Sequence, residues 1–127
     1  MSFAAQYIGQ PWVAGESDCW SFARRVWADH FGISVSVVEI DAYSLLSCVK
    51  ACATHAERES WVPVSDYTDG DGVLMGRSVK RPSHVGVVVG GGILHSLEGL
   101  GVMYHDPVTL GNMGWHILGY YRHRSRL

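Results

Sequence analysis

The stretch that decides the fold reads SHVGVVVGGGILHS and spans residues 83–96. Its first half is rich in valine, a residue that favours strands, and three consecutive glycines then interrupt the run. The stretch therefore predicts two strands, residues 84–89 and 93–97, joined by a tight turn. Each strand carries one histidine, His84 and His95.

The register of this hairpin decides whether the two histidines meet. Gly90 and Gly91 suit a two-residue type I′ turn, which needs positive φ at both central positions. Paired residue numbers then sum to 181, and His95 lies opposite Gly86, on the sheet face of His84. A sum of 179, with His95 directly opposite His84, would also let the two histidines meet. A turn one residue later keeps the face but moves His95 too far along to orient His84, and a three-residue loop turns it to the other face. Because Gly86 has no side chain, we also expect it to leave room for a helix end on this face.

The N-terminal half of the chain has a helical pattern. Ser17 and Asp18 are N-cap candidates for a helix over residues 19–31, and Gly32 is a typical residue at which such a helix stops. An apolar stripe predicts a second helix over residues 41–56. The remaining predicted strands are residues 72–75, 102–106 and 115–121.

Helices first and strands after indicate an α+β fold, in which N-terminal helices pack on a central antiparallel sheet of about five strands. The length suits a single domain, residues 1–127. A net charge of −2 gives no electrostatic reason to expect a nucleic-acid partner. No apolar run approaches the ~20 residues of a membrane span. No signal peptide opens the chain, so we expect it to be made in the cytoplasm.

The chain has three cysteines, an odd number that does not describe a complete disulfide framework. Cys48 and Cys52 lie four residues apart in the second predicted helix, and we interpret them as packing residues. Cys19 begins the first predicted helix, where unpaired backbone N–H groups and the helix dipole favour a thiolate, the reactive form. The alternative interpretation of Cys19 is a small buried hydrophobic residue.

A cysteine nucleophile needs a base that takes its proton and later returns it to the leaving group. Histidine suits this role near neutral pH, and the imidazole needs a third group that fixes its tautomer. His84 and His95, on one sheet face opposite Cys19, fit these two roles, although each could be an ordinary strand residue. We interpret the later histidines as surface or satisfied side chains; they are His105, His116 and His123.

Three motifs occur in an informative order: DCWSF at residues 18–22, HVGV at 84–87 and GGILHS at 91–96. Together they resemble the NlpC-type cell-wall peptidases, and the segments at residues 7–12 and 71–74 resemble that family's lead-in and first strand. The resemblance implies a papain-like α+β fold. It also implies cleavage of peptidoglycan stem peptides, commonly after D-glutamate, through a thioester intermediate.

The same resemblance assigns roles residue by residue. It makes Cys19 the nucleophile, His84 the base and His95 the orienting third member of a Cys-His-His triad, with no metal or other cofactor. We expect four further residues to line the substrate site: Trp12, Trp20, Ser83 and Ser96.

Two departures from the family pattern concern the same site. The family's Ser-Gly after the cysteine is Trp20-Ser21 here, and Trp12 stands where the family has a tyrosine, so an N–H donor replaces a hydroxyl. The compact Trp-x-x-Gly-x-x-Asp-Cys-Trp form resembles the subgroup found in bacteriophage tail-tip assembly proteins. That likeness implies phage tail proteins as partners and delivery to the cell wall by a virion or by lysis.

Three other interpretations stay open from the sequence. The thioester could pass to an acceptor other than water, which would make the chain a thiol acyltransferase. The departures from the family pattern also fit a structural phage-tail module with an altered or inactive site. Finally, Cys19, His84 and His95 could hold zinc with an open fourth position.

Overall fold

The computed structural model describes residues 3–38, 43–44 and 56–127. The predicted second helix over residues 41–56, with Cys48 and Cys52, therefore lies almost entirely outside the described residues. Within the described ranges, none of the helices has the length and apolar character needed to cross a membrane.

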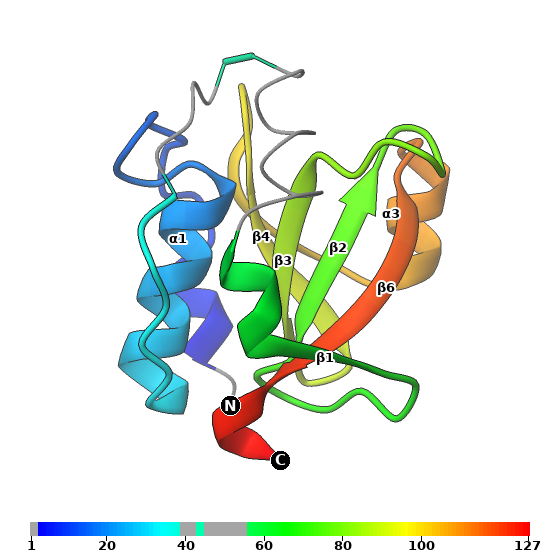
Figure 1. Ribbon diagram of the computed structural model, residues 1–127. Helices are drawn as coiled ribbons and strands as arrows, with labels where there is room; N and C mark the ends of the chain where they lie inside the picture. The colour runs from blue at the N-terminus through cyan, green and yellow to red at the C-terminus, as the bar shows by residue number, and fades with distance from the viewer. Residues whose placement is uncertain (1–2, 39–42, 45–55) are drawn as a thin grey trace.

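The described residues form one antiparallel sheet of six strands in the order β1-β6-β2-β3-β4-β5, with helices α1 and α3 on opposite sides of it (Figure 1). This arrangement confirms the α+β fold with a central antiparallel sheet. The strands are β1 (Trp61–Val64), β2 (Gly72–Gly76), β3 (His84–Val89), β4 (Gly92–Leu97), β5 (Gly101–His105) and β6 (His116–His123). The helices are α1 (Cys19–Val26), a π-helical turn (Trp27–Phe31), α3 (Pro107–Asn112) and the 3-10 turns Phe3–Gln6, Ala56–Ser60 and Arg124–Arg126.

Strand β1 is the sixth strand, which the sequence pattern does not predict. It is four residues long and contains Pro63, which has no backbone N–H to give to a ladder. The strand lies at the edge of the sheet and pairs only with β6. A proline is tolerated at such an edge. Because proline usually argues against a strand, a prediction from the sequence pattern misses this one.

Helix α1 confirms the predicted helix and both of its ends. Asp18 is the N-cap: its carboxylate accepts hydrogen bonds from the backbone N–H of Ser21 at 2.9 Å and of Gly15 at 2.7 Å. The helix continues through the π-helical turn and stops at Gly32, which has φ of 64°. A left-handed glycine at this position is the usual way for a helix to end.

The β3–β4 hairpin has the register that the triad hypothesis requires. Val88 pairs with Ile93 and Val89 with Gly92, so paired residue numbers sum to 181. The two turn residues, Gly90 and Gly91, have φ of 58° and 80°, as a type I′ turn demands. His84 and His95 therefore share one face of the sheet.

Each face of the sheet has its own hydrophobic core. Helix α1 packs on the face of Val87, Val89 and Leu94, whereas α3 covers the other face through Leu110. The histidines lie on the α3 side, so the expectation that Gly86 makes room for a helix end is wrong. A Cβ atom at Gly86 would instead lie 2.6 Å from Ile93 Cγ2 and 3.2 Å from His95 Cβ. The glycine makes room for the neighbouring strand's side chains.

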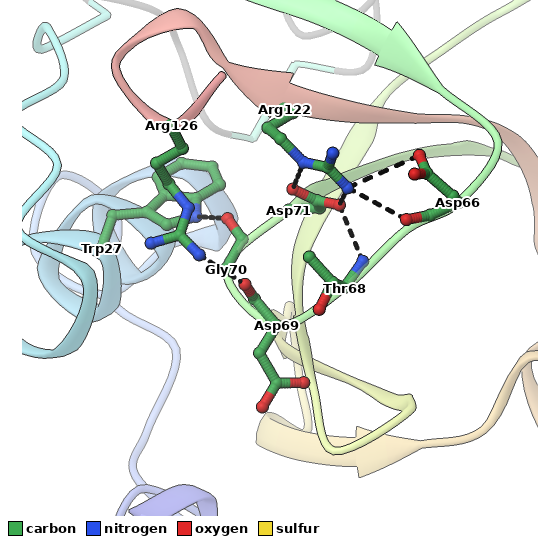
Figure 2. Close-up of polar contacts among 8 residues, drawn as sticks. All are labelled: Trp27, Asp66, Thr68, Asp69, Gly70, Asp71, Arg122 and Arg126. Atoms are coloured by element: carbon green, nitrogen blue, oxygen red, sulfur yellow. Dashed lines mark hydrogen bonds and ion pairs between the residues drawn. The ribbon is translucent and has the colours of Figure 1, made fainter.

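A partly buried ion pair links β6 to the start of β2 (Figure 2). Asp71 is fully buried and accepts hydrogen bonds from Arg122 Nε at 3.0 Å and Nη2 at 2.9 Å. The backbone N–H of Thr68 donates to the same carboxylate at 2.8 Å. Beside it, Trp27 Nε1 donates to the carbonyl of Gly70 at 3.0 Å. We call Asp71, Arg122 and Thr68 the ion-pair cluster; it joins β6 to the loop before β2.

Candidate active site

A cleft of about 280 Å³ contains both the N-terminus of α1 and the first residue of β3. Cys19 and His84, the two residues with proposed chemistry, line it together. Trp12, Ser83 and Ser96 also line it, as the sequence predicts. The lining residues that the sequence did not single out for this site include Tyr43, Arg77, Glu98, Met113 and Trp115.

Cys19 is the first residue of α1 and is partly exposed. The backbone N–H groups of a first helical turn have no partner within the helix, and with the helix dipole they favour an anion. The neighbouring Asp18 is 7% exposed, and both of its oxygens accept backbone N–H groups. Asp18 therefore acts as a cap, as predicted, and not as an acid.

The loop before Cys19 is held by serine hydroxyls. Ser17 Oγ donates to the carbonyl of Pro11 at 2.6 Å and accepts from the backbone N–H of Val13 at 3.0 Å. Ser96 Oγ, fully buried, donates to the carbonyl of Ser17 at 2.6 Å. The hydroxyl of Ser96 therefore holds the loop that precedes Cys19, while the side chain also lines the cleft, and its substrate-binding role stays a prediction.

Three histidines form a continuous hydrogen-bonded chain on the α3 side of the sheet. His84 Nε2 lies 2.8 Å from His95 Nδ1, and His95 Nε2 lies 2.9 Å from His105 Nδ1. His84 is 6% exposed and His95 is fully buried, while His105 at the end of β5 is partly exposed. The bond from His84 to His95 uses Nε2, which leaves Nδ1 as the nitrogen of His84 available for Cys19.

Burial keeps the two inner imidazoles of this chain, those of His84 and His95, uncharged. It lowers the pKa of His84 well below the usual histidine range, and the neighbouring His95 and Arg77 lower it further. Burial, followed by the neighbouring His105, lowers the pKa of His95 to about 3. Both imidazoles are therefore neutral near pH 7, and a neutral imidazole is the form that can accept a proton.

The other side of His84 is covered by an aromatic ring. The ring of Trp115 stacks on His84 with centroids 4.8 Å apart and planes at 28°. Arg77 lies over the same indole, with its guanidinium carbon 4.0 Å from the ring centroid, and its Nη1 donates to the carbonyl of Met113. His84 is thus held between His95 and Trp115, which limits the rotation of its imidazole.

The two predicted tryptophans have different surroundings. Trp12 lines the cleft, where its ring meets Tyr43 edge-on at 5.2 Å. Trp20 is not among the described residues of the cleft wall: its ring packs against Trp27, and its Nε1 donates to the carbonyl of Ser36 at 2.9 Å. The side chain of Trp20 therefore belongs to the packing around α1 in this structure, and its role in substrate binding stays a prediction.

His105 is a third histidine at this site, and the sequence motifs do not assign it a role. Its partial exposure and its hydrogen bond agree with the interpretation as a surface or satisfied histidine, and that bond also makes it the third member of the chain. The β4–β5 ladder pairs His95 with Met103 and Ile93 with His105, so the two histidines are diagonal neighbours on one face. Counting the register of this second hairpin would have found His105, as it found His95.

The zinc hypothesis has no geometric support. His84 and His95 direct ring nitrogens at each other, and those atoms are used by the hydrogen bond between them. Within the part of the chain that the structure describes, no group of three or more His, Cys, Asp or Glu side chains is arranged to hold a metal ion.

The fold and the site define a papain-like α+β domain, in which a cysteine at the start of the helix and a histidine at the start of a strand line one cleft. The sequence model of the NlpC/P60 family matches residues 9–116, and the chain belongs to that family. Among solved structures, the chain is similar to the NlpC/p60 domain of the peptidoglycan hydrolase SagA, with a TM-score of 0.58 and 22% identity. That match covers 93% of this chain and 90% of the other, and it supports the fold. No curated protein matches the sequence.

Proposed function

We propose that this chain is a cysteine peptidase that cleaves peptidoglycan stem peptides. The observation that carries the proposal is that Cys19 and His84 line one cleft, and that a hydrogen bond to His95 holds the imidazole of His84. Family membership supports the substrate class, and the similar SagA domain comes from a peptidoglycan hydrolase.

The proposed reaction begins with transfer of the Cys19 thiol proton to Nδ1 of His84. The thiolate sulfur attacks the scissile carbonyl carbon, and the backbone N–H groups at the start of α1 stabilise the resulting oxyanion. The C–N bond breaks as the imidazolium returns its proton to the leaving amine, and a thioester remains. Water, deprotonated by His84, then attacks the thioester, and Cys19 leaves as a thiol.

Defined muropeptides test the proposal, with products read by mass spectrometry. We expect cleavage of one peptide bond with gain of one water, and no cleavage by Cys19→Ala. A product joined to an added amine instead of water would favour the thiol acyltransferase alternative. Cleavage that persists in Cys19→Ala would contradict the role of Cys19.

The alternative of an inactive phage-tail module depends on the departures at Trp12 and Trp20. Trp20 packs beside α1 and lies apart from the described cleft wall, so its replacement of a small family residue leaves Cys19 and His84 in place. Iodoacetamide labelling with peptide mapping separates the two cases. Fast labelling of Cys19 beside slow labelling of Cys48 and Cys52 supports the enzyme, whereas equally slow labelling of all three supports the inactive module.

Phage tail partners and delivery by a virion or by lysis rest on the Trp-x-x-Gly-x-x-Asp-Cys-Trp pattern alone. They stay part of the proposal and need a separate experiment. Detection of the chain in purified virions by mass spectrometry would support them, and its absence from virions that otherwise assemble would contradict them.

A further inference from the structure

His105 carries an inference that goes beyond the Cys-His-His set. The chain of imidazoles crosses three neighbouring strands, from His84 on β3 through His95 on β4 to His105 on β5. Both ring nitrogens of His95 are engaged, one by each neighbour. If His105 accepts a hydrogen bond from the fully buried His95, then His95 accepts one from His84, and if His105 donates, His95 donates to His84.

The proton count allows only two arrangements. A neutral imidazole has one N–H donor and one bare nitrogen acceptor. If His95 carries its proton on Nε2, it donates to His105 and accepts from His84 Nε2, which leaves Nδ1 of His84 bare. If His95 carries its proton on Nδ1, both bonds reverse and the proton of His84 sits on Nδ1. Only in the first arrangement is Nδ1 of His84 unprotonated and able to accept the proton of Cys19.

We propose that His105 is a positioning residue that selects the first arrangement by accepting a hydrogen bond at Nδ1 from His95 Nε2. The proposal rests on the proposed function, because it takes His84 as the base for Cys19. Its physical ground is the cost of an unpaired buried donor. Without an acceptor at position 105, the first arrangement leaves a buried N–H of His95 unpaired, whereas the second leaves only a bare nitrogen, and orphaned buried N–H groups are the rarer case.

The surroundings of His105 allow this role to be tested without rebuilding the fold. Asp106, the next residue, caps α3 by accepting the backbone N–H of Thr109 at 2.7 Å, so its carboxylate is turned toward the helix. His105 itself is partly exposed, and its neighbours along β5 keep their ladder with β4 through backbone bonds. A side-chain substitution at this position therefore changes the end of the imidazole chain and leaves the cap in place.

A matched pair of variants tests the proposal. The side chains introduced by His105→Asn and His105→Leu have the same branching and the same number of heavy atoms, but only asparagine can offer an acceptor near the position of Nδ1. We expect iodoacetamide to label Cys19 at least about tenfold more slowly in His105→Leu, because wrong-tautomer variants of triads lose more than that. We expect His105→Asn to stay within about threefold of the wild-type rate, and the control His123→Leu, outside the described cleft wall, to match the wild type.

A second readout distinguishes positioning from simple destabilisation. Nitrogen-15 NMR of histidine-labelled protein should show the proton of His84 on Nε2 in the wild type and in His105→Asn, and a shift toward Nδ1 in His105→Leu. Unchanged labelling and an unchanged His84 tautomer in His105→Leu would overturn the inference, as would equal losses in both variants. Neither readout uses a peptide substrate. Slow labelling of Cys19 in the wild type would instead count against the proposed function.

Discussion

Two buried polar groups of residues in this domain invite comparison: the ion-pair cluster and the histidine chain. In the first, Asp71 is fully buried, and Arg122 and Thr68 fill both of its oxygens (Figure 2). In the second, three imidazoles are hydrogen-bonded in a row, and Nδ1 of His84 at one end is not used by the bond to His95. The ion-pair cluster is charged and its carboxylate is fully paired, whereas the chain has neutral imidazoles at His84 and His95 and ends at the cleft.

The difference shows how one small domain uses burial for two purposes. A buried carboxylate is tolerated only with a full set of partners, so the cluster fixes the path of β6 and the loop before β2. Burial has a different effect on the histidines: it lowers the pKa of His84 and keeps that imidazole neutral. Changes to the cluster should therefore alter stability, and changes to the chain should alter reactivity.

The largest expected effect is on reactivity, from His84→Gln. Glutamine can keep a hydrogen bond to His95 but cannot accept the proton of Cys19. Loss of a general base lowers turnover by about 10²–10⁴-fold, and muropeptide hydrolysis should fall within that range. The urea midpoint at pH 7 should stay close to that of the wild type. A large loss of stability with normal turnover per folded molecule would break the comparison.

The next effect is on stability, from Arg122→Leu. This change leaves the buried Asp71 carboxylate without its guanidinium, and removal of one partner of a buried ion pair should lower the melting temperature by roughly 10 °C or more. Alkylation of Cys19 below the transition should be unchanged. The double variant Asp71→Leu with Arg122→Leu is the matched control, because it removes both charges and should recover part of the loss. A single variant that melts like the wild type would contradict the structural role of the cluster.

How far the sequence predicts this molecule depends on whether a feature is local. The valines before Gly90 and Gly91 specify a hairpin, its turn type and its register, so the shared face of His84 and His95 follows from counting. The N-cap Asp18 likewise follows from residues within one helical turn. These predictions succeed because the groups involved are close in sequence.

The features that the sequence does not reveal depend on contacts between distant segments. Trp115 stacks on His84 from the residue before β6, and the pairing of β6 with β2 shifts register between Leu74 and Met75. The sequence around Trp115 does not predict that register shift. The sequence also does not show which face of the sheet α1 covers. Alternation of side chains along a strand shows only that the sheet has two faces.

A third prediction concerns the pH dependence of stability. The pKa values of His84 and His95 are lowered in the folded state, so below about pH 6.5 the unfolded chain binds protons that the folded chain does not. The free energy of unfolding should therefore be unaffected by these two groups above that pH and fall below it. Each histidine contributes a slope of about 1.4 kcal/mol per pH unit. His95→Asn removes one of them, so urea midpoints measured from pH 7 to pH 4.5 should decline less steeply. An unchanged decline would contradict the burial of His95 as the cause.

The smallest effect should come from Ser96→Ala, which touches both properties. The buried hydroxyl of Ser96 donates to the carbonyl of Ser17, next to the N-cap of the helix that begins at Cys19. Its loss leaves that carbonyl without its partner and should lower the free energy of unfolding by about 1–2 kcal/mol. The loosened loop should also slow turnover by a few-fold, since the loop that precedes the nucleophile is displaced. Ser125→Ala, which loses a surface bond to His123, is the control and should change neither quantity. If Ser96→Ala lowers stability while turnover per folded molecule stays normal, Ser96 belongs with the ion-pair cluster as a purely structural contact.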